Sequence, residues 1–157
     1  MRSCEVATFW RYIASSLDRL VGLVDGLDEE GLNWRPPAPG ANSLNVLAAH
    51  TLGNAEENLL EILGGRRVGR DREAEFGATA DARASASLRE RWQGLRVRIE
   101  AAVAVLPPAE LDREREHPRR GTLTGRDVLI VVARHAAEHL GQAELTRDLL
   151  LASRGEG

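Results

Sequence analysis

The sequence predicts an all-α fold, a four-helix bundle with long connections. Hydrophobic residues make up 43% of the chain but aromatic residues only 4%, and leucine, alanine and valine dominate, which favours helix over an all-β architecture. Apolar residues recur three or four positions apart in four long segments, separated by stretches rich in proline, glycine or charge. Because 157 residues suffice for one substantial core, we expect a single domain over residues 1–157.

The first two expected helices flank a proline-rich connection. Apolar spacing predicts the first helix over residues 5–27. Residues 32–43, LNWRPPAPGANS, contain three prolines and a glycine and therefore exclude helix. Ser43 is expected to cap a second helix, which ends near Leu63 because two glycines follow.

Two further helices are expected after long connections. Residues 65–84 form a connection long enough to contain a short helical turn or a functional loop. Residues 87–90, SLRE, match a capping box for the third helix, which ends at the prolines of residues 107–108. After another long connection, residues 124–127, TGRD, match a second capping box and begin a fourth helix that reaches about residue 152.

Charge and composition argue against several classes of protein. The net charge is −3, and the arginines of residues 66–72 alternate with acidic residues, which predicts an exposed loop and no nucleic-acid binding. We find neither a signal-peptide pattern nor an apolar run long enough to span a bilayer, so we expect a soluble cytoplasmic protein without a membrane partner. Cys4 is the only cysteine, which excludes an intrachain disulfide and a cysteine-rich zinc site.

Three of the four histidines fall on helix faces that should point inward. His135 and His139 lie four positions apart in RHAAEHLGQ, a spacing at which two imidazoles can share one cation. His50 lies in LAAHTLGN, where the second helix is apolar nearly all round, whereas His117 lies in the polar run REREHPRR and should be exposed. Three neutral imidazoles complete a common open metal site; three packed structural histidines are the alternative.

Polar residues near these histidines are candidates for catalysis. Asn54 and Glu57 share the helix face of His50, and Gln142 follows His139 by three positions. Glu57 lies about 10 Å from His50 along the helix axis, which suits a base or a substrate contact. Asn54 and Gln142 are placed to orient water, substrate or a ligand ring. The alternative role for each of the three is to line a solvated groove.

The order of these motifs resembles that of a known family. Residues 33–59, NWRPPAPGANSLNVLAAHTLGNAEENL, combine a proline-rich loop, a helix-opening serine and a histidine, and residues 134–150, RHAAEHLGQAELTRDLL, contain a late H-x-x-x-H-x-G-Q. In this order, over nearly its whole length, the chain resembles the DinB-like (YfiT-like) superfamily of metalloenzymes. The resemblance implies an up-down-down-up bundle, a homodimer, and His50, His135 and His139 as three metal ligands.

The resemblance also implies a metal-dependent reaction. Characterised branches of the superfamily include transferases and isomerases that use low-molecular-weight thiols. We therefore expect a divalent metal, with zinc or nickel favoured by the nitrogen ligands, and transfer of a thiol sulfur to a small-molecule substrate. A non-catalytic metal- or ligand-binding helical module is one alternative. A metal-assisted hydrolase is the other, because residues 135–139 fit H-x-x-E-H.

Overall fold

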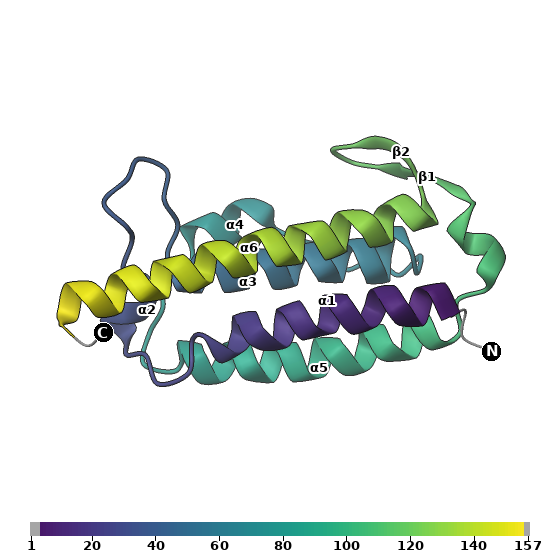
Figure 1. The fold of residues 1–157 in the computed structure, drawn as a ribbon. Coiled ribbons are helices and arrows are strands. Elements are labelled where there is room, and N and C mark those ends of the chain that lie inside the picture. Colours follow the sequence, from purple (N-terminus) through teal and green to yellow (C-terminus); the bar gives the residue numbers. More distant parts are fainter. Residues whose placement is uncertain (1–3, 156–157) are drawn as a thin grey trace.

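Four long helices lie side by side in the computed structural model, which describes residues 4–155 (Figure 1). They are α1 (Cys4–Gly22), α3 (Leu44–Glu56), which continues as the π-helix η1 (Glu57–Ile62), α5 (Ala84–Ala104) and α6 (Gly125–Arg154). The shorter elements are α2 (Glu29–Asn33), α4 (Arg72–Gly77), the 3-10 helix η2 (Pro108–Leu111) and the strands β1 (Glu114–His117) and β2 (Gly121–Thr124). The predicted all-α bundle is confirmed.

The chain direction explains why two connections are long. In Figure 1, α1 and α6 run one way along the bundle, and α3 and α5 run the other way. Since α3 and α5 are parallel, the chain must return along the bundle between them, and it forms α4 on the way. α4 packs on α3, so the short helical turn expected in this connection is present.

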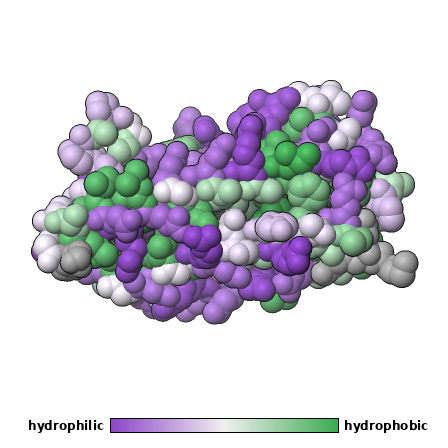
Figure 2. Space-filling model, viewed as in Figure 1, coloured by the Kyte–Doolittle hydropathy of each residue, from purple (hydrophilic) through white to green (hydrophobic). Residues whose placement is uncertain are grey.

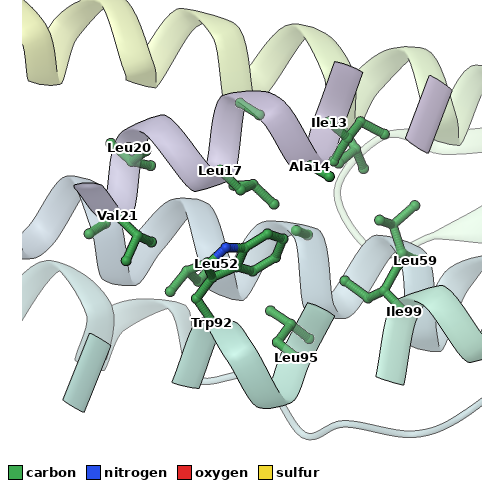
Figure 3. Close-up of a cluster of buried hydrophobic side chains, with 14 of the residues drawn as sticks. Ile13, Ala14, Leu17, Leu20, Val21, Leu52, Leu59, Trp92, Leu95 and Ile99 are labelled. Carbon is green, nitrogen blue, oxygen red and sulfur yellow. The ribbon is translucent and has the colours of Figure 1, made fainter. Parts of the chain in front are cut away.

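The apolar stripes of the long helices meet in one core. Trp10 and Trp92 lie with ring centroids 6.3 Å apart between α1 and α5. Trp92 also donates its indole N–H to Asp18 at 2.7 Å, so its one polar atom is satisfied. Figure 3 shows part of this core, to which α1, α3 and α5 contribute Leu17, Leu52 and Leu95.

α3 is the most enclosed helix of the bundle. Every residue from 44 to 55 is buried, since α1, α5 and α6 pack around it and α4 covers it from outside. This agrees with a sequence that is apolar nearly all round in this stretch. A polar side chain on α3 must therefore find its partners inside the protein.

Two of the three predicted caps are confirmed. Ser43 Oγ accepts the backbone N–H of Val46, and Thr124 forms a complete capping box with Asp127. The predicted cap of the third helix is wrong, because α5 begins at Ala84 and residues 87–90 lie inside it. Asp81 Oδ1 accepts the backbone N–H of residue 83 and starts a turn that leads directly into the helix.

The first helix is shorter than its apolar pattern predicts. Residues 23–27 form tighter turns with hydrogen bonds to residues three positions earlier, and Gly26 has a φ of 75°. α1 therefore ends at Gly22, and the positive φ of Gly26 stops the turns that follow it, although the apolar spacing continues to Leu27.

The connection over residues 107–123 contains a β-hairpin that the sequence did not predict. β1 and β2 pair antiparallel, with Glu114 opposite Thr124 and His117 opposite Gly121. Gly121 has a φ of 70°, a conformation that glycine adopts at little steric cost. In Figure 1 the hairpin projects from the start of α6, and α6 contacts β2.

The face of the protein shown in Figure 2 is mostly hydrophilic. On the face shown in Figure 2, polar and charged residues cover most of the protein and are interrupted by smaller apolar patches. Within residues 4–155, no helix has the length and apolar character that a membrane-spanning segment needs.

Candidate metal centre

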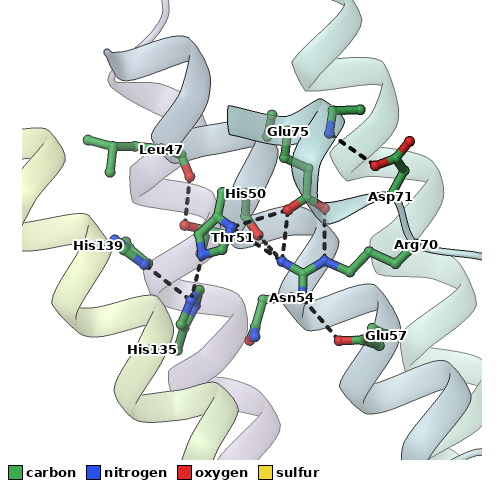
Figure 4. Close-up of polar contacts among 12 residues, drawn as sticks. Leu47, His50, Thr51, Asn54, Glu57, Arg70, Asp71, Glu75, His135 and His139 are labelled. Atoms are coloured by element: carbon green, nitrogen blue, oxygen red, sulfur yellow. Dashed lines mark hydrogen bonds and ion pairs between the residues drawn. The ribbon is translucent and has the colours of Figure 1, made fainter. Parts of the chain in front are cut away.

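Three histidine rings meet between α3 and α6 (Figure 4). His50 comes from α3, and His135 and His139 lie one turn apart on the facing side of α6. His135 Nε2 is 3.1 Å from His50 Nε2 and 3.1 Å from His139 Nε2. One ligand nitrogen of each ring lies within 4.8 Å of the other two. The structure thus brings together the three histidines that the sequence singled out.

Partners on the outer nitrogens orient two of these rings. His50 Nδ1 lies 3.1 Å from Glu75 Oε2, and His139 Nδ1 lies 2.7 Å from Gln142 Oε1. Carboxylate and amide oxygens only accept hydrogen bonds, so each Nδ1 carries the proton. The unprotonated Nε2 atoms of both rings therefore face the centre of the cluster, as metal-binding histidines do.

The cluster suits a cation better than it suits three hydrogen-bonded rings. His135 Nε2 can hold one hydrogen and donate it fully to only one of its two neighbours. If it does so, His135 Nδ1 is unprotonated, and this atom is buried without a partner among the described residues. Two nitrogens that share a zinc at about 2.0–2.1 Å in a tetrahedral site lie about 3.3 Å apart. The observed separations are close to this, so the three histidines could hold a divalent metal.

The environment keeps the α6 histidines neutral. Burial is the main cause that lowers the pKa of His135 to about 3, and the nearby rings of His139 and His50 lower it further. Burial also lowers the pKa of His139, although its hydrogen bond with Gln142 opposes this shift. Neutral imidazole is the form that binds a metal, so both rings remain available as ligands below the ordinary histidine pKa.

A buried arginine supports His50 from the side of α4. The side chain of Arg70 is 5% exposed and donates to Glu75 through Nε and Nη2, each at 2.8 Å. Its Nη1 donates to Glu57 Oε2 at 3.0 Å. Nη2 also lies 3.3 Å from His50 Nδ1, but its shorter bond is to Glu75. A bidentate pair fixes the orientation of the carboxylate, so Arg70 holds Glu75 against His50.

The prediction that the arginines of residues 66–72 form an exposed loop is wrong for Arg70. Arg66, Arg67 and Arg72 are exposed as expected. Arg70, however, is enclosed where α4 folds onto α3, because two buried glutamates there offset its charge. Those partners lie 13 and 5 positions away in the sequence, on different elements, so local charge patterning could not identify them.

Glu57 and Glu75 are ionised and paired. Burial alone would raise the pKa of Glu57, but hydrogen bonds from Arg119 and Arg70 outweigh burial and lower it. For Glu75, burial is likewise outweighed by hydrogen bonds with His50 and Arg70, and its pKa is lowered too. The sequence suggested Glu57 as a base or substrate contact; the structure places it in ion pairs with two arginines.

His117 is buried, contrary to the expectation from its polar surroundings. It is 5% exposed, and the burial along β1 alternates, with Arg115 and His117 turned inward and Glu114 and Glu116 outward. Burial thus alternates with the two-residue period of a strand, although the inward-facing residues are charged or polar instead of apolar. The alternation in RERE was the signal for both the strand and the burial of His117.

The histidine cluster opens into a pocket of about 500 Å³. Two of the suggested catalytic residues, Asn54 and Gln142, line it together with the three clustered histidines. The remaining wall comes from the proline-rich connection, the α4 region and the hairpin turn, and consists of Asn42, Arg70, Arg72, Phe76, His117, Arg119 and Arg120.

A comparison with protein families assigns the chain to one of them. The model of the DinB superfamily matches residues 12–143, a span that includes all three clustered histidines and the pocket. The chain belongs to the DinB superfamily. A comparison with curated proteins finds no match. Membership of this superfamily and the three adjacent histidines are both compatible with a metal-binding protein.

In this DinB protein a glycine makes room for the carboxylate that orients His50. Gly53 lies one turn after His50 on α3, and a Cβ atom at this position would overlap the carboxylate of Glu75. A glycine inside a helix lowers helix stability relative to alanine. At Gly53 the close approach of Glu75 accounts for its presence.

We expect Gly53→Ala to weaken metal binding although it changes no ligand. The methyl group displaces Glu75 from His50 Nδ1, and loss of such an outer partner typically raises the metal Kd by about 10–100-fold. Gly94→Ala in α5 is the matched control, because its Cβ would meet nothing within 4 Å. Titration with zinc measures both variants, and an unchanged Kd for Gly53→Ala would refute the role given to Glu75.

Without metal, the protein should lose stability as the pH falls from 7 to 5. The pKa of His135 is about 3 when folded and ordinarily 6.5, so between these values the unfolded chain binds more protons. One such group removes at most about 1.4 kcal/mol per pH unit. The pKa values of Glu57 and Glu75 are lowered from 4.5, so protonation of these carboxylates reduces stability mainly below pH 4.5, outside the range from pH 7 to 5. Urea unfolding with chelator should show a shallower pH dependence for His135→Gln, and parallel slopes would contradict this.

Proposed function

We propose that this protein is a divalent-metal-dependent enzyme that transfers the sulfur of a low-molecular-weight thiol to a small electrophilic substrate. The main support is the convergence of the Nε2 atoms of His50, His135 and His139 at the wall of a pocket. Three nitrogen ligands favour zinc or nickel and leave a further coordination position for a reactant. The pocket volume of about 500 Å³ suits a small molecule.

The bound ion would supply a Lewis acid that lowers the pKa of a thiol in the pocket. Gln142 Oε1 accepts a hydrogen bond from the Nδ1–H of His139, so that the Nε2 lone pair of His139 faces the pocket. Asn54 lines the pocket, and its Oδ1 is buried without a partner among residues 4–155, so it can accept a hydrogen bond from an N–H or O–H of the substrate. Glu57 positions Arg70 and Arg119 and does not act as the base.

The transfer reaction is a nucleophilic substitution at carbon. The thiol loses its proton to solvent, its sulfur forms a bond to the electrophilic carbon, and the leaving group departs with the electron pair of its former bond. The protein contributes by binding both reactants in one pocket, which removes much of the entropic cost of bringing them together.

Metal analysis tests the first half of this proposal. Reconstituted wild-type protein should hold about one equivalent of zinc or nickel, and His135→Ala and His139→Asn should hold almost none. His117→Ala is the control, because it removes a pocket histidine that lies outside the cluster. Circular dichroism verifies that each variant is folded. Less than about half an equivalent in the wild type would overturn the metal centre.

Turnover tests the second half. The metal-loaded protein, mixed with a chromogenic aryl chloride and a panel of low-molecular-weight thiols, should release chloride at a rate that depends on the thiol. Chelation should abolish this rate, zinc or nickel should restore it, and His139→Asn should lack it at the same metal concentration. Full metal occupancy without turnover for any thiol would overturn the transferase proposal in favour of a non-catalytic metal-binding module.

A further inference from the structure

The wall of the pocket is strongly basic on the side of α4 and the hairpin turn. None of the aspartates and glutamates of residues 4–155 lines this pocket. Two kinds of positive charge can therefore face the same pocket. One is a metal ion at the three histidines, and the other is a set of guanidinium groups. The guanidinium groups belong to Arg70, Arg72, Arg119 and Arg120.

Only part of this positive charge is neutralised. Arg70 and Arg119 pair with the two buried glutamates described above. Arg72 lies over the ring of Phe76, 4.9 Å from its centroid, and neither Arg72 nor Arg120 forms an ion pair within residues 4–155. Four guanidinium groups and two carboxylates leave two positive charges that face the pocket.

His117 adds a hydrogen-bond donor without a partner. Its Nδ1 accepts the backbone N–H of Arg119 at 3.1 Å, so the hydrogen of the neutral ring is on Nε2. Burial is the main cause that lowers the pKa of His117, and Arg119 lowers it further, which favours the neutral ring. His117 is 5% exposed, lines the pocket, and its Nε2 has no partner among the described residues. A buried N–H group without an acceptor is unfavourable, and an oxygen of a ligand would satisfy it.

We propose that the hairpin turn, residues 117–120, is an anion-binding site and that the substrate carries a carboxylate or phosphate group. The Nε2–H of His117 donates one hydrogen bond to an anionic oxygen, and Arg120 and Arg119 donate charge-assisted ones. The inference rests on the proposed function in one respect, that the substrate occupies the same pocket. Since this pocket joins the hairpin turn to the histidines, one molecule can place its anionic group at the turn and its reactive carbon near the metal.

Binding of matched aromatic probes tests the site. Benzoate, phenyl phosphate and neutral benzamide share a phenyl ring and differ in the group that the hairpin would bind. Each is titrated calorimetrically into metal-free and zinc-loaded protein, and the metal-free protein isolates the hairpin from anion binding at zinc. At least one anion should bind both forms, and benzamide should bind neither.

Substitutions locate the binding to the hairpin turn. Arg120→Gln and His117→Ala should each raise the Kd of the bound anion about tenfold, because each removes one hydrogen bond to a charged group. His117→Gln keeps an N–H donor and should restore much of the affinity. Arg113→Gln is the matched control, since Arg113 is an exposed arginine just before the same hairpin and does not line the pocket.

Each outcome decides the proposal. Tighter binding of benzoate identifies a carboxylate substrate, and tighter binding of phenyl phosphate identifies a phosphate substrate. Binding of anions only to zinc-loaded protein, equal affinity for benzamide, or equal effects of Arg120→Gln and Arg113→Gln would overturn the hairpin site. Because anion binding is measured directly in the metal-free protein, these results do not depend on whether the histidines hold a metal. A failure of the hairpin site can therefore be distinguished from a failure of the proposed function.

Discussion

Three imidazole nitrogens, of which the one on His135 lies within hydrogen-bond distance of the other two, are the constraint on which the rest of this structure depends. Lone pairs that face each other repel, and buried polar atoms without partners are unfavourable. Glu75 and Gln142 impose the arrangement, because they fix the protons of His50 and His139 on Nδ1 and leave the lone pairs of both Nε2 atoms facing the centre. A divalent cation at the centre would turn the same repulsion into three favourable contacts, so binding of a metal there would stabilise the bundle.

The ion pairs around Glu57 and Glu75 join three segments that are distant in the sequence. Arg70 connects both glutamates, and Arg119 of the hairpin turn also contacts Glu57. Two guanidinium groups and two carboxylates are mutually neutral, but removing any one leaves an uncompensated charge in a mostly buried setting, which is strongly destabilising. The helix changes from α to π at Glu57, and π-helical turns are frequent at functional sites. The hairpin is thus attached to the bundle through the same charges that border the pocket.

The sequence predicted those features whose signals are local. Apolar spacing indicated the long helices, Ser43 and the Thr124 capping box marked two of their starts, and the histidine spacing on α6 follows from helix geometry. The burial of Arg70 could not be predicted in this way, because it depends on partners that only the folded chain supplies. The burial of His117 did have a local signal, the two-residue alternation along β1. Because neither residue was expected to be buried, the donor-rich half of the pocket was missed, while its histidine half was identified.

Glu75 links the two halves of the pocket electrostatically. A guanidinium group beside a histidine that binds a cation would repel that cation. Arg70 lies beside His50, with Nη2 3.3 Å from Nδ1. Glu75 contacts both groups, so it orients the ring and also offsets the charge of Arg70. A carboxylate placed between them therefore allows arginines that could bind an anion to lie next to histidines that could hold a cation.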